Sequence, residues 1–143
     1  MRRTLTISLT ALALALPSAD AWAAGSAQKA PLKKIIVAKK SFTGSLGQAD
    51  RWGNVQVTIV VKKTTTLVGT KKTVKRHIES IKVPVYPDHT GRSVFISNNS
   101  LPTLVQEALQ AQSTHIYIVS GATFTSDAFG QSLQSAITKE KAW

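Results

Sequence analysis

The stretch that most constrains this chain lies near its C-terminus, where three patterns follow one another. Residues 115–119 form an apolar run of β type, and Ser120, Gly121 and Ala122 follow as a run of small residues. Beyond them, apolar residues recur at the spacing of one helix face. The residues on that face are Phe129, Leu133, Ala136 and Ile137. We therefore predict a strand, a tight turn and a helix in this order.

This turn would place Thr123 at the start of the predicted helix. Gly121 can adopt backbone angles that are closed to other residues, so a tight turn is possible there. Thr125 or Ser126 is expected to cap the helix, as short hydroxyl side chains commonly do. The hydroxyl of Thr123 would then lie beside free backbone N–H groups, which is a natural place for a phosphate.

The preceding residues predict an antiparallel sheet. Residues 33–47 are rich in β-type apolar residues, and residues 55–61 alternate between apolar and polar positions, as expected of a half-buried strand. Residues 78–85 resume the sheet, and their proline places them at an edge or at the end of a strand. Between them, residues 62–76 form a basic connection or an extended ribbon, with a turn at Gly69.

A helix is predicted before the C-terminal turn. Residues 86–99 have the composition of a loop, and Ser100 is expected to cap a helix in which Pro102 occupies the first turn. Together these elements predict a single small α+β domain, an antiparallel sheet with helices packed on one face.

Three blocks of the chain resemble one known family. Residues 118–126, Ile-Val-Ser-Gly-Ala-Thr-Phe-Thr-Ser, resemble the flavinylation motif of the FMN-binding domain family. This family includes secreted flavoproteins and the FMN-carrying subunits of sodium-pumping and Rnf-type redox complexes. Residues 50–57 resemble the entry into its first strand, and residues 100–113 resemble the helix before the motif. The blocks occur in the family's order, over roughly residues 42–137.

The resemblance implies a cofactor and the residues that hold it. In the family, the threonine that matches Thr123 carries FMN through a phosphoester bond. A separate magnesium-dependent flavin transferase makes the bond, using FAD as donor and releasing AMP. The expected cofactor-binding residues are Ser120, Gly121, Ala122, Thr123, Thr125 and Ser126.

Thr123 is expected to be a substrate of that transferase, and no catalytic residue is predicted. No His, Asp or Glu lies beside it in the sequence to activate its weakly nucleophilic hydroxyl. The flavin would carry the redox chemistry, while the protein positions it.

The chain departs from the family pattern at Tyr117, where the family usually carries an acidic residue. Ser97 also replaces an asparagine that is often found in the family, although Asn98 follows it. Two alternatives therefore stay open, which are non-covalent FMN binding and a flavin-free module of the same fold.

The N-terminus has the pattern of a secretory signal peptide. Arg2 and Arg3 precede a short apolar run over residues 5–16, and Ala21-Trp22-Ala23 resembles a cleavage site. We predict a signal peptide over residues 1–23, a linker over residues 24–34 and the FMN-binding domain over residues 35–143. The domain would be exported to the periplasm or the extracellular space, with membrane association as a further possibility.

The amino-acid composition excludes several kinds of cofactor and metal site. The chain has no cysteine, which excludes disulfides, thioether-linked haem, cysteine-ligated zinc and iron–sulfur clusters. The three histidines are scattered without ligand spacing, so no metal site is predicted. The net charge of +11 favours anionic surfaces or partners, but export argues against nucleic acid.

The leading hypothesis is an exported FMN-binding electron carrier that is not an enzyme by itself. It would relay electrons between a redox partner, membrane-bound or soluble, and an acceptor. The other alternative is a basic surface-interaction protein, in which residues 62–76 contact an acidic partner or an anionic lipid.

Overall fold

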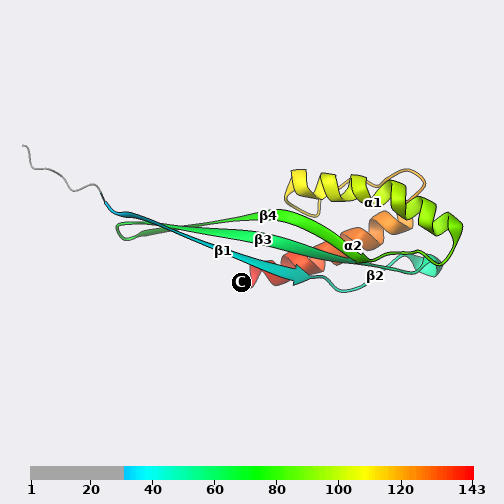
Figure 1. The fold of residues 1–143 in the computed structure, drawn as a ribbon, viewed down its shortest axis with the longest axis horizontal. Coiled ribbons are helices and arrows are strands. Elements are labelled where there is room, and N and C mark those ends of the chain that lie inside the picture. Colours follow the sequence, from blue (N-terminus) through cyan, green and yellow to red (C-terminus); the bar gives the residue numbers. More distant parts are fainter. Residues whose placement is uncertain (1–30) are drawn as a thin grey trace, which may run out of the picture. The chain divides into compact units, whose positions relative to one another are not determined.

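The computed structural model describes residues 31–143, so the predicted signal peptide and residues 24–30 of the predicted linker lie outside the described residues. The described part contains four strands and two helices, with a short 3-10 helix, η1, among them (Figure 1). In chain order the elements are β1 (Lys33–Thr43), β2 (Gly47–Gln48), η1 (Asp50–Trp52), β3 (Asn54–Val68), β4 (Lys71–Val85), α1 (Gly91–Ala111) and α2 (Thr123–Lys141). The predicted α+β class is confirmed. Strand β1 begins at Lys33, two residues before the predicted start of the domain.

Strand β3 is the centre of the sheet. It pairs antiparallel with β1, with the short strand β2 and with β4. The β3–β4 hairpin closes at Gly69, whose φ of 60° is the left-handed conformation that tight hairpin turns require. Residues 62–76 therefore form an extended ribbon, one of the two arrangements that the sequence predicts. Pro84 lies next to the last residue of β4, where its missing N–H costs no pairing within the sheet.

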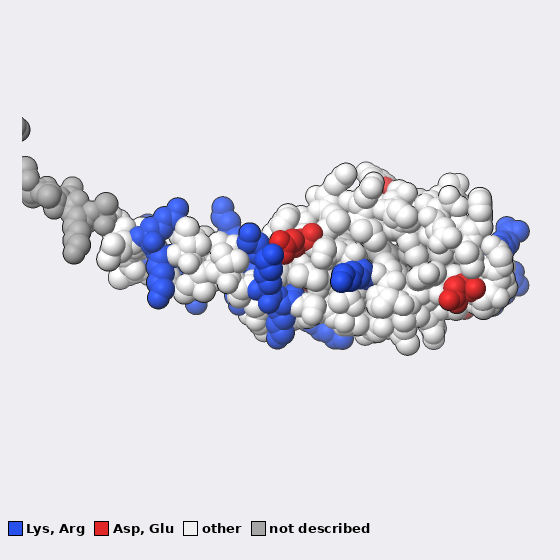
Figure 2. Space-filling model, viewed as in Figure 1, with Lys and Arg blue, Asp and Glu red and all other residues white. Residues whose placement is uncertain are grey.

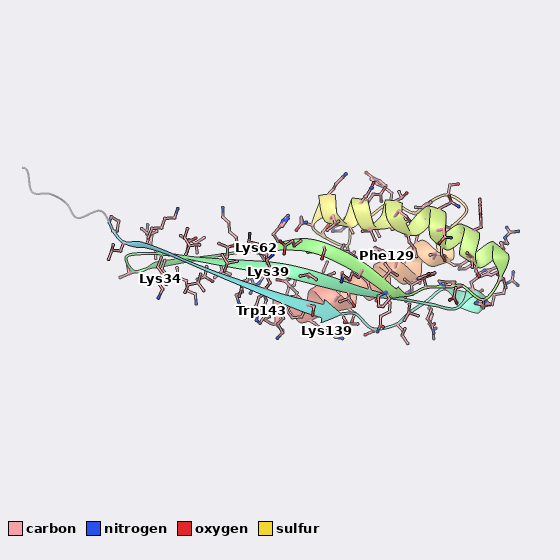
Figure 3. The ribbon with its side chains drawn as sticks, viewed as in Figure 1. Lys34, Lys39, Lys62, Phe129, Lys139 and Trp143 are labelled. Carbon is pink, nitrogen blue, oxygen red and sulfur yellow. The ribbon has the colours of Figure 1, made fainter. Side chains whose placement is uncertain are left out.

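The core lies between one face of this sheet and both helices. Every second residue of β3 from Val55 to Val61 is buried, as the alternation predicts. Phe129 and Leu133 of α2 are also fully buried, and Figure 3 shows Phe129 on this helix, which packs mainly on β3. Helix α1 adds Leu101, Leu104 and Ala108 to the same cluster. Both helices thus cover a single face of the sheet.

Helix α2 approaches the β1–β2 segment so closely that only small residues fit. A Cβ atom on Gly47 would lie 1.9 Å from the carbonyl oxygen of Ala128, and one on Gly44 would lie 2.0 Å from that of Ser132. The Ser132 hydroxyl accepts a hydrogen bond of 2.8 Å from the backbone N–H of Val57. The helix is therefore joined to the sheet by backbone contact as well as by apolar packing.

Helix α1 begins earlier than predicted. Its N-cap is Thr90, which forms a capping box with Ser93, so residues 91–99 are helical and Pro102 lies inside the helix. The prediction of a loop over residues 86–99 and of a cap at Ser100 was wrong beyond residue 90. The first turns bury Ser93, Ser97 and Ser100 rather than large apolar residues. A polar stripe of this kind does not produce an apolar helical pattern.

Two further predictions around the C-terminal turn were wrong. Residues 115–119 belong to no strand, because they pair with none of the strands in the described structure. Neither Thr125 nor Ser126 caps α2, since both lie inside the helix and are buried. The N-cap is Ala122.

Within residues 31–143, neither helix combines the length and the apolar character that crossing a membrane requires.

Candidate functional site

The turn before α2 is held by hydrogen bonds of the motif itself. Gly121 has a φ of 79°, a conformation that glycine adopts at little cost. The N–H of Ala122 donates to the carbonyl oxygen of Val119 over 3.0 Å. The buried hydroxyl of Ser126 accepts from the N–H of Val119 and donates to the carbonyl oxygen of Ala122. Ser126 therefore fixes the geometry of the turn, which leaves the residues after Gly121 in one defined position.

Thr123 is the first residue of α2, and its side chain is exposed. In the part of the chain that the structure describes, no side chain caps this helix, because the N-cap residue is Ala122. The N–H groups of the first helical turn thus lack a partner within the helix, and they carry the positive end of its dipole. The structure places the Thr123 hydroxyl at a helix terminus that favours an anion, as the sequence predicts.

A pocket of about 160 Å³ lies beside Thr123. Its walls come from η1, from the β4–α1 connection, from the first turns of α1 and from the turn before α2, segments that the chain brings together only on folding. The lining residues are Trp52, Pro87, Arg92, Ser93, Ile96, Gly121, Ala122, Thr123, Phe124 and Thr125. Four of the six predicted cofactor-binding residues line this one pocket. Ser126 lies behind it, and Ser120 faces a second hollow.

That second hollow, also of about 160 Å³, lies on the other side of the turn. It shares Ile96, Gly121 and Ala122 with the first, so the turn separates two adjoining depressions. Exposed aromatic rings flank them, with Phe124 (51% exposed) beside the first and Phe95 (69% exposed) beside the second. Aromatic rings at the rim of a pocket offer stacking surface to a planar ligand.

Arg92 is the functional candidate that sequence reasoning missed. It lies in the first turn of α1 and lines the pocket together with Thr123, where it supplies a positive charge beside a helix N-terminus. Trp52, whose side chain is half-buried, lines the same pocket. The one signal in the sequence was the spacing of Thr90 and Ser93, a weak capping box that would have started the helix at this point. With the helix start assigned to Ser100, Arg92 remained in a loop.

The pocket supplies no proton acceptor for catalysis. No carboxylate and no imidazole are among its lining residues. Within residues 31–143 no cluster of His, Cys, Asp or Glu could hold a metal ion either. A hydroxyl without a base or a metal is a weak nucleophile, and no residue that lines this pocket activates the Thr123 hydroxyl.

Tyr117 lies outside this pocket. Its side chain is 83% exposed, and it lines a separate hollow with Glu107 and His115. Its backbone N–H donates to Glu107 Oε2 over 3.0 Å, which ties the segment before the turn to α1. Ser97 is buried and donates to the carbonyl oxygen of Pro87, while Asn98 is exposed. Ser97 thus holds the β4–α1 connection against α1, below the pocket.

Comparison with known proteins agrees with this geometry. The model of the FMN-binding domain family matches residues 50–138, from η1 to the last turn of α2. The match therefore includes every wall of the pocket beside Thr123. No curated protein matches the chain.

Proposed function

Because the chain belongs to the FMN-binding domain family and FMN is its cofactor, we propose that it is an exported electron carrier whose FMN is joined to Thr123 by a phosphoester bond. The observation that carries this proposal is the position of the Thr123 hydroxyl. It is exposed at the uncapped start of α2, in the same pocket as Arg92.

The residues of the pocket fit the phosphate of FMN. The first N–H groups of α2 and the Arg92 guanidinium supply donors and positive charge to one small space. A pocket of about 160 Å³ is smaller than the roughly 300–1,000 Å³ of sites that enclose a whole ligand. We therefore assign the pocket to the phosphate and to part of the ribityl chain.

The isoalloxazine ring would then lie at the surface. Trp52 and Phe124 line the pocket, and Phe95 lies beyond the turn, so a planar ring that leaves the pocket meets aromatic side chains on either side. A ring held in this way stays accessible to a second protein, as electron exchange between carriers requires.

Formation of the bond would need a separate flavin transferase. The oxygen of Thr123 attacks the FMN phosphorus of FAD, the P–O–P bond breaks, AMP leaves, and the hydroxyl proton passes to a base. Since the pocket has no such base, the transferase must supply it together with its magnesium ion. The exposure of Thr123 gives that enzyme access.

The bound flavin would supply the redox chemistry, and the chain's own residues would hold and orient it. The predicted signal peptide supports export to the periplasm or the extracellular space. A redox partner there, soluble or membrane-bound, would exchange electrons with the exposed ring.

The test is the intact mass of the mature protein purified from its own host, followed by peptide mapping. We expect a gain of one FMN minus water, located on the peptide that contains Thr123. Thr123→Ala should abolish this gain, while Thr123→Ser, which keeps a hydroxyl, should retain some of it. Thr123 is exposed at the start of α2, so the free energies of unfolding of both variants should lie within about 0.5 kcal/mol of that of the parent. Flavin that remains on denatured Thr123→Ala would refute the assignment.

A second candidate function is non-covalent FMN binding by the same pocket. The residue that favours it is Tyr117, which stands where the family usually has an acidic residue and which lies outside the pocket. In that case the protein from its own host would have an unmodified mass, and it would bind added FMN reversibly. A failure to bind FMN at all would leave the flavin-free module.

A further inference from the structure

Part of the sheet extends beyond the helices. We call this part the ribbon and define it as residues 33–40 of β1, 62–68 of β3 and 71–77 of β4 (Figure 1). Trp143, at the C-terminal end of α2, marks its base, where Lys63 donates to the Trp143 carbonyl oxygen and Lys40 lies over the Trp143 ring. Figure 3 shows Lys34 on the far part of the ribbon, beyond Trp143. The ribbon therefore contributes little to the core, and its surface needs another explanation.

The ribbon is strongly positive. Ten of the chain's 18 lysines and arginines lie in it, and its residues include no aspartate or glutamate. Figure 2 shows these cations gathered along the extension, whereas the thicker part carries both signs. The nearest acid in the sequence is Glu79, which is paired with Lys39 at 2.7 Å. The hydrogen bond from Lys39 lowers the pKa of Glu79, so this carboxyl group stays ionised and paired with Lys39.

The cations at the base of the ribbon are engaged, but those at its tip are not. Arg76 Nε lies 3.0 Å from Glu140 Oε1, an ion pair without the alignment of a hydrogen bond. Among residues 31–143, no hydrogen bond or ion pair involves the side-chain ammonium groups of the lysines at the tip. These are Lys33, Lys34, Lys71, Lys72 and Lys75. Their charges remain available to a partner.

Aliphatic side chains lie between these lysines. Ile35 (54% exposed) and Val37 (50% exposed) point to one face of the ribbon, and Ile36 points to the other. The strand register places Ile36 in one row with Thr65 and Val74, beside a row of Lys34, Leu67 and Lys72. Both faces therefore combine apolar side chains with lysines. Exposed apolar groups concentrated in one region mark an interaction surface.

We propose that the ribbon docks on a surface of anionic phospholipid. Lysines extend their charged ends toward lipid phosphates while their stems lie along apolar surface, and aliphatic side chains enter the interface between them. The ribbon has no Phe, Tyr or Trp on which a nucleic acid base could stack, and only one of its ten cations is arginine. Pairing of two ribbons edge to edge would bring like charges together. This proposal does not depend on the proposed flavin bond.

Docking by the ribbon would also orient the flavin site. The N-terminal ends of α1 and α2 lie at the end of the sheet opposite to the ribbon tip (Figure 1). The length of β3 separates the two ends by roughly 45 Å at about 3.3 Å per residue. A ribbon that engages lipid by its tip would hold the site away from the lipid, toward partners outside the bilayer.

The test is co-sedimentation of the mature protein, purified from its own host, with vesicles. Vesicles of pure phosphatidylcholine are compared with an equal mixture of phosphatidylglycerol and phosphatidylcholine, over a range of salt concentrations. We expect binding to the mixed vesicles only, with a partition coefficient that falls as salt rises. The double variant Lys34→Gln with Lys72→Gln should lower that coefficient roughly 30-fold, at roughly fivefold for each lysine.

Matched variants separate the ribbon from net charge. Lys82→Gln with Lys141→Gln removes two charges outside the ribbon and should change binding by less than about threefold, through net charge alone. Ile35→Ser with Val37→Ser keeps every charge and should remove the binding that persists at high salt. All variants are compared as mature protein, so the predicted signal peptide does not contribute to binding. Unchanged unfolding midpoints would show that each variant folds.

Three results would overturn the proposal. They are equal binding to both kinds of vesicle, equal losses in the two charge variants, and no binding to mixed vesicles at low salt. Binding to DNA or to an acidic protein, in the absence of vesicle binding, would assign the ribbon to a different polyanion.

Discussion

At the scale of single residues, the site depends on the Thr123 hydroxyl and on the absence of a side chain that caps the start of α2. The N-cap of α2 is alanine, so no side chain competes for the first N–H groups of the helix. Ser126 is used in holding the turn, and Thr125 is buried. Thr123 alone presents an exposed hydroxyl where these N–H groups and Arg92 meet. The chemistry of the pocket thus favours one residue for a phosphoester.

The role of Arg92 can be measured apart from the covalent bond. In the Thr123→Ala background, Arg92→Gln should weaken FMN binding about tenfold, since hydrogen bonds to charged groups contribute about 1.5–3 kcal/mol and Arg92 is exposed. Riboflavin, which lacks the phosphate, should bind both proteins equally. Fluorescence titrations with each ligand provide the measurement, and Lys82→Gln serves as the charge-matched control. If Arg92→Gln weakened riboflavin binding as much as FMN binding, Arg92 would contact the ring and not the phosphate.

At the scale of elements, helix α2 connects the site to the sheet. Its N-terminus bears Thr123, its apolar face fills the core, and its small residues allow the β1–β2 segment to reach the helix backbone. The N–H of Ser45 donates to the Ser135 hydroxyl over 3.0 Å, and the two hydroxyl groups are hydrogen-bonded to each other over 2.8 Å. A change in this contact would move the whole helix, and the start of the helix with it.

Two glycine variants test this contact. Gly47→Ala should lower the free energy of unfolding by at least about 2 kcal/mol, because its Cβ would lie 1.9 Å from the Ala128 carbonyl oxygen and the backbones must separate. Gly130→Ala is the matched control within α2. The added Cβ would meet open space, and the higher helix propensity of alanine should raise the free energy of unfolding by about 0.5–1 kcal/mol. Urea denaturation of both variants gives the comparison. A Gly47→Ala protein as stable as the parent would contradict the close approach.

At the scale of the whole described domain, one strand takes part in two regions of different character. Residues 55–61 of β3 lie in the core, while residues 62–68 of the same strand lie in the ribbon, where sheet hydrogen bonds and the contact of Lys63 with Trp143 hold them. The site lies at the core end and the lysine-rich surface at the ribbon end. The two proposed functions therefore lie at opposite ends of the domain and can be altered independently.

Hydrogen exchange should reveal this division. We expect amides of residues 62–68 to exchange through local opening, and those of residues 55–61 only through opening close to global unfolding. The reason is that the ribbon has few buried contacts to lose when it frays. Hydrogen exchange measured by mass spectrometry on overlapping β3 peptides provides the test. Uniform protection along β3 would mean that the ribbon folds as part of the core. Binding to anionic vesicles should slow exchange in residues 62–68 and leave residues 55–61 unchanged.

What the sequence by itself determined are the features that local patterns encode. Alternation defined the buried face of β3, helical spacing defined the apolar face of α2, and the run around Gly121 defined the turn that exposes Thr123. Each of these features depends on residues within about a dozen positions of one another, so its pattern can be recognised in the sequence alone. The family resemblance, confirmed over residues 50–138, came from the same local blocks.

Only the tertiary structure decided the features that depend on distant residues. Helix α1 begins at Gly91, and its first turns bury Ser93, Ser97 and Ser100. Burial of these serines is possible because their hydroxyls donate to backbone oxygens. An apolar pattern in the sequence does not reveal a helix face of this kind. That start brings Arg92 to Thr123. Residues 115–119 have the composition of a strand, yet no edge of the described sheet receives them. The ribbon is likewise exposed because α2 ends beside Lys63, so its lysines and aliphatic side chains lie beyond the reach of the core.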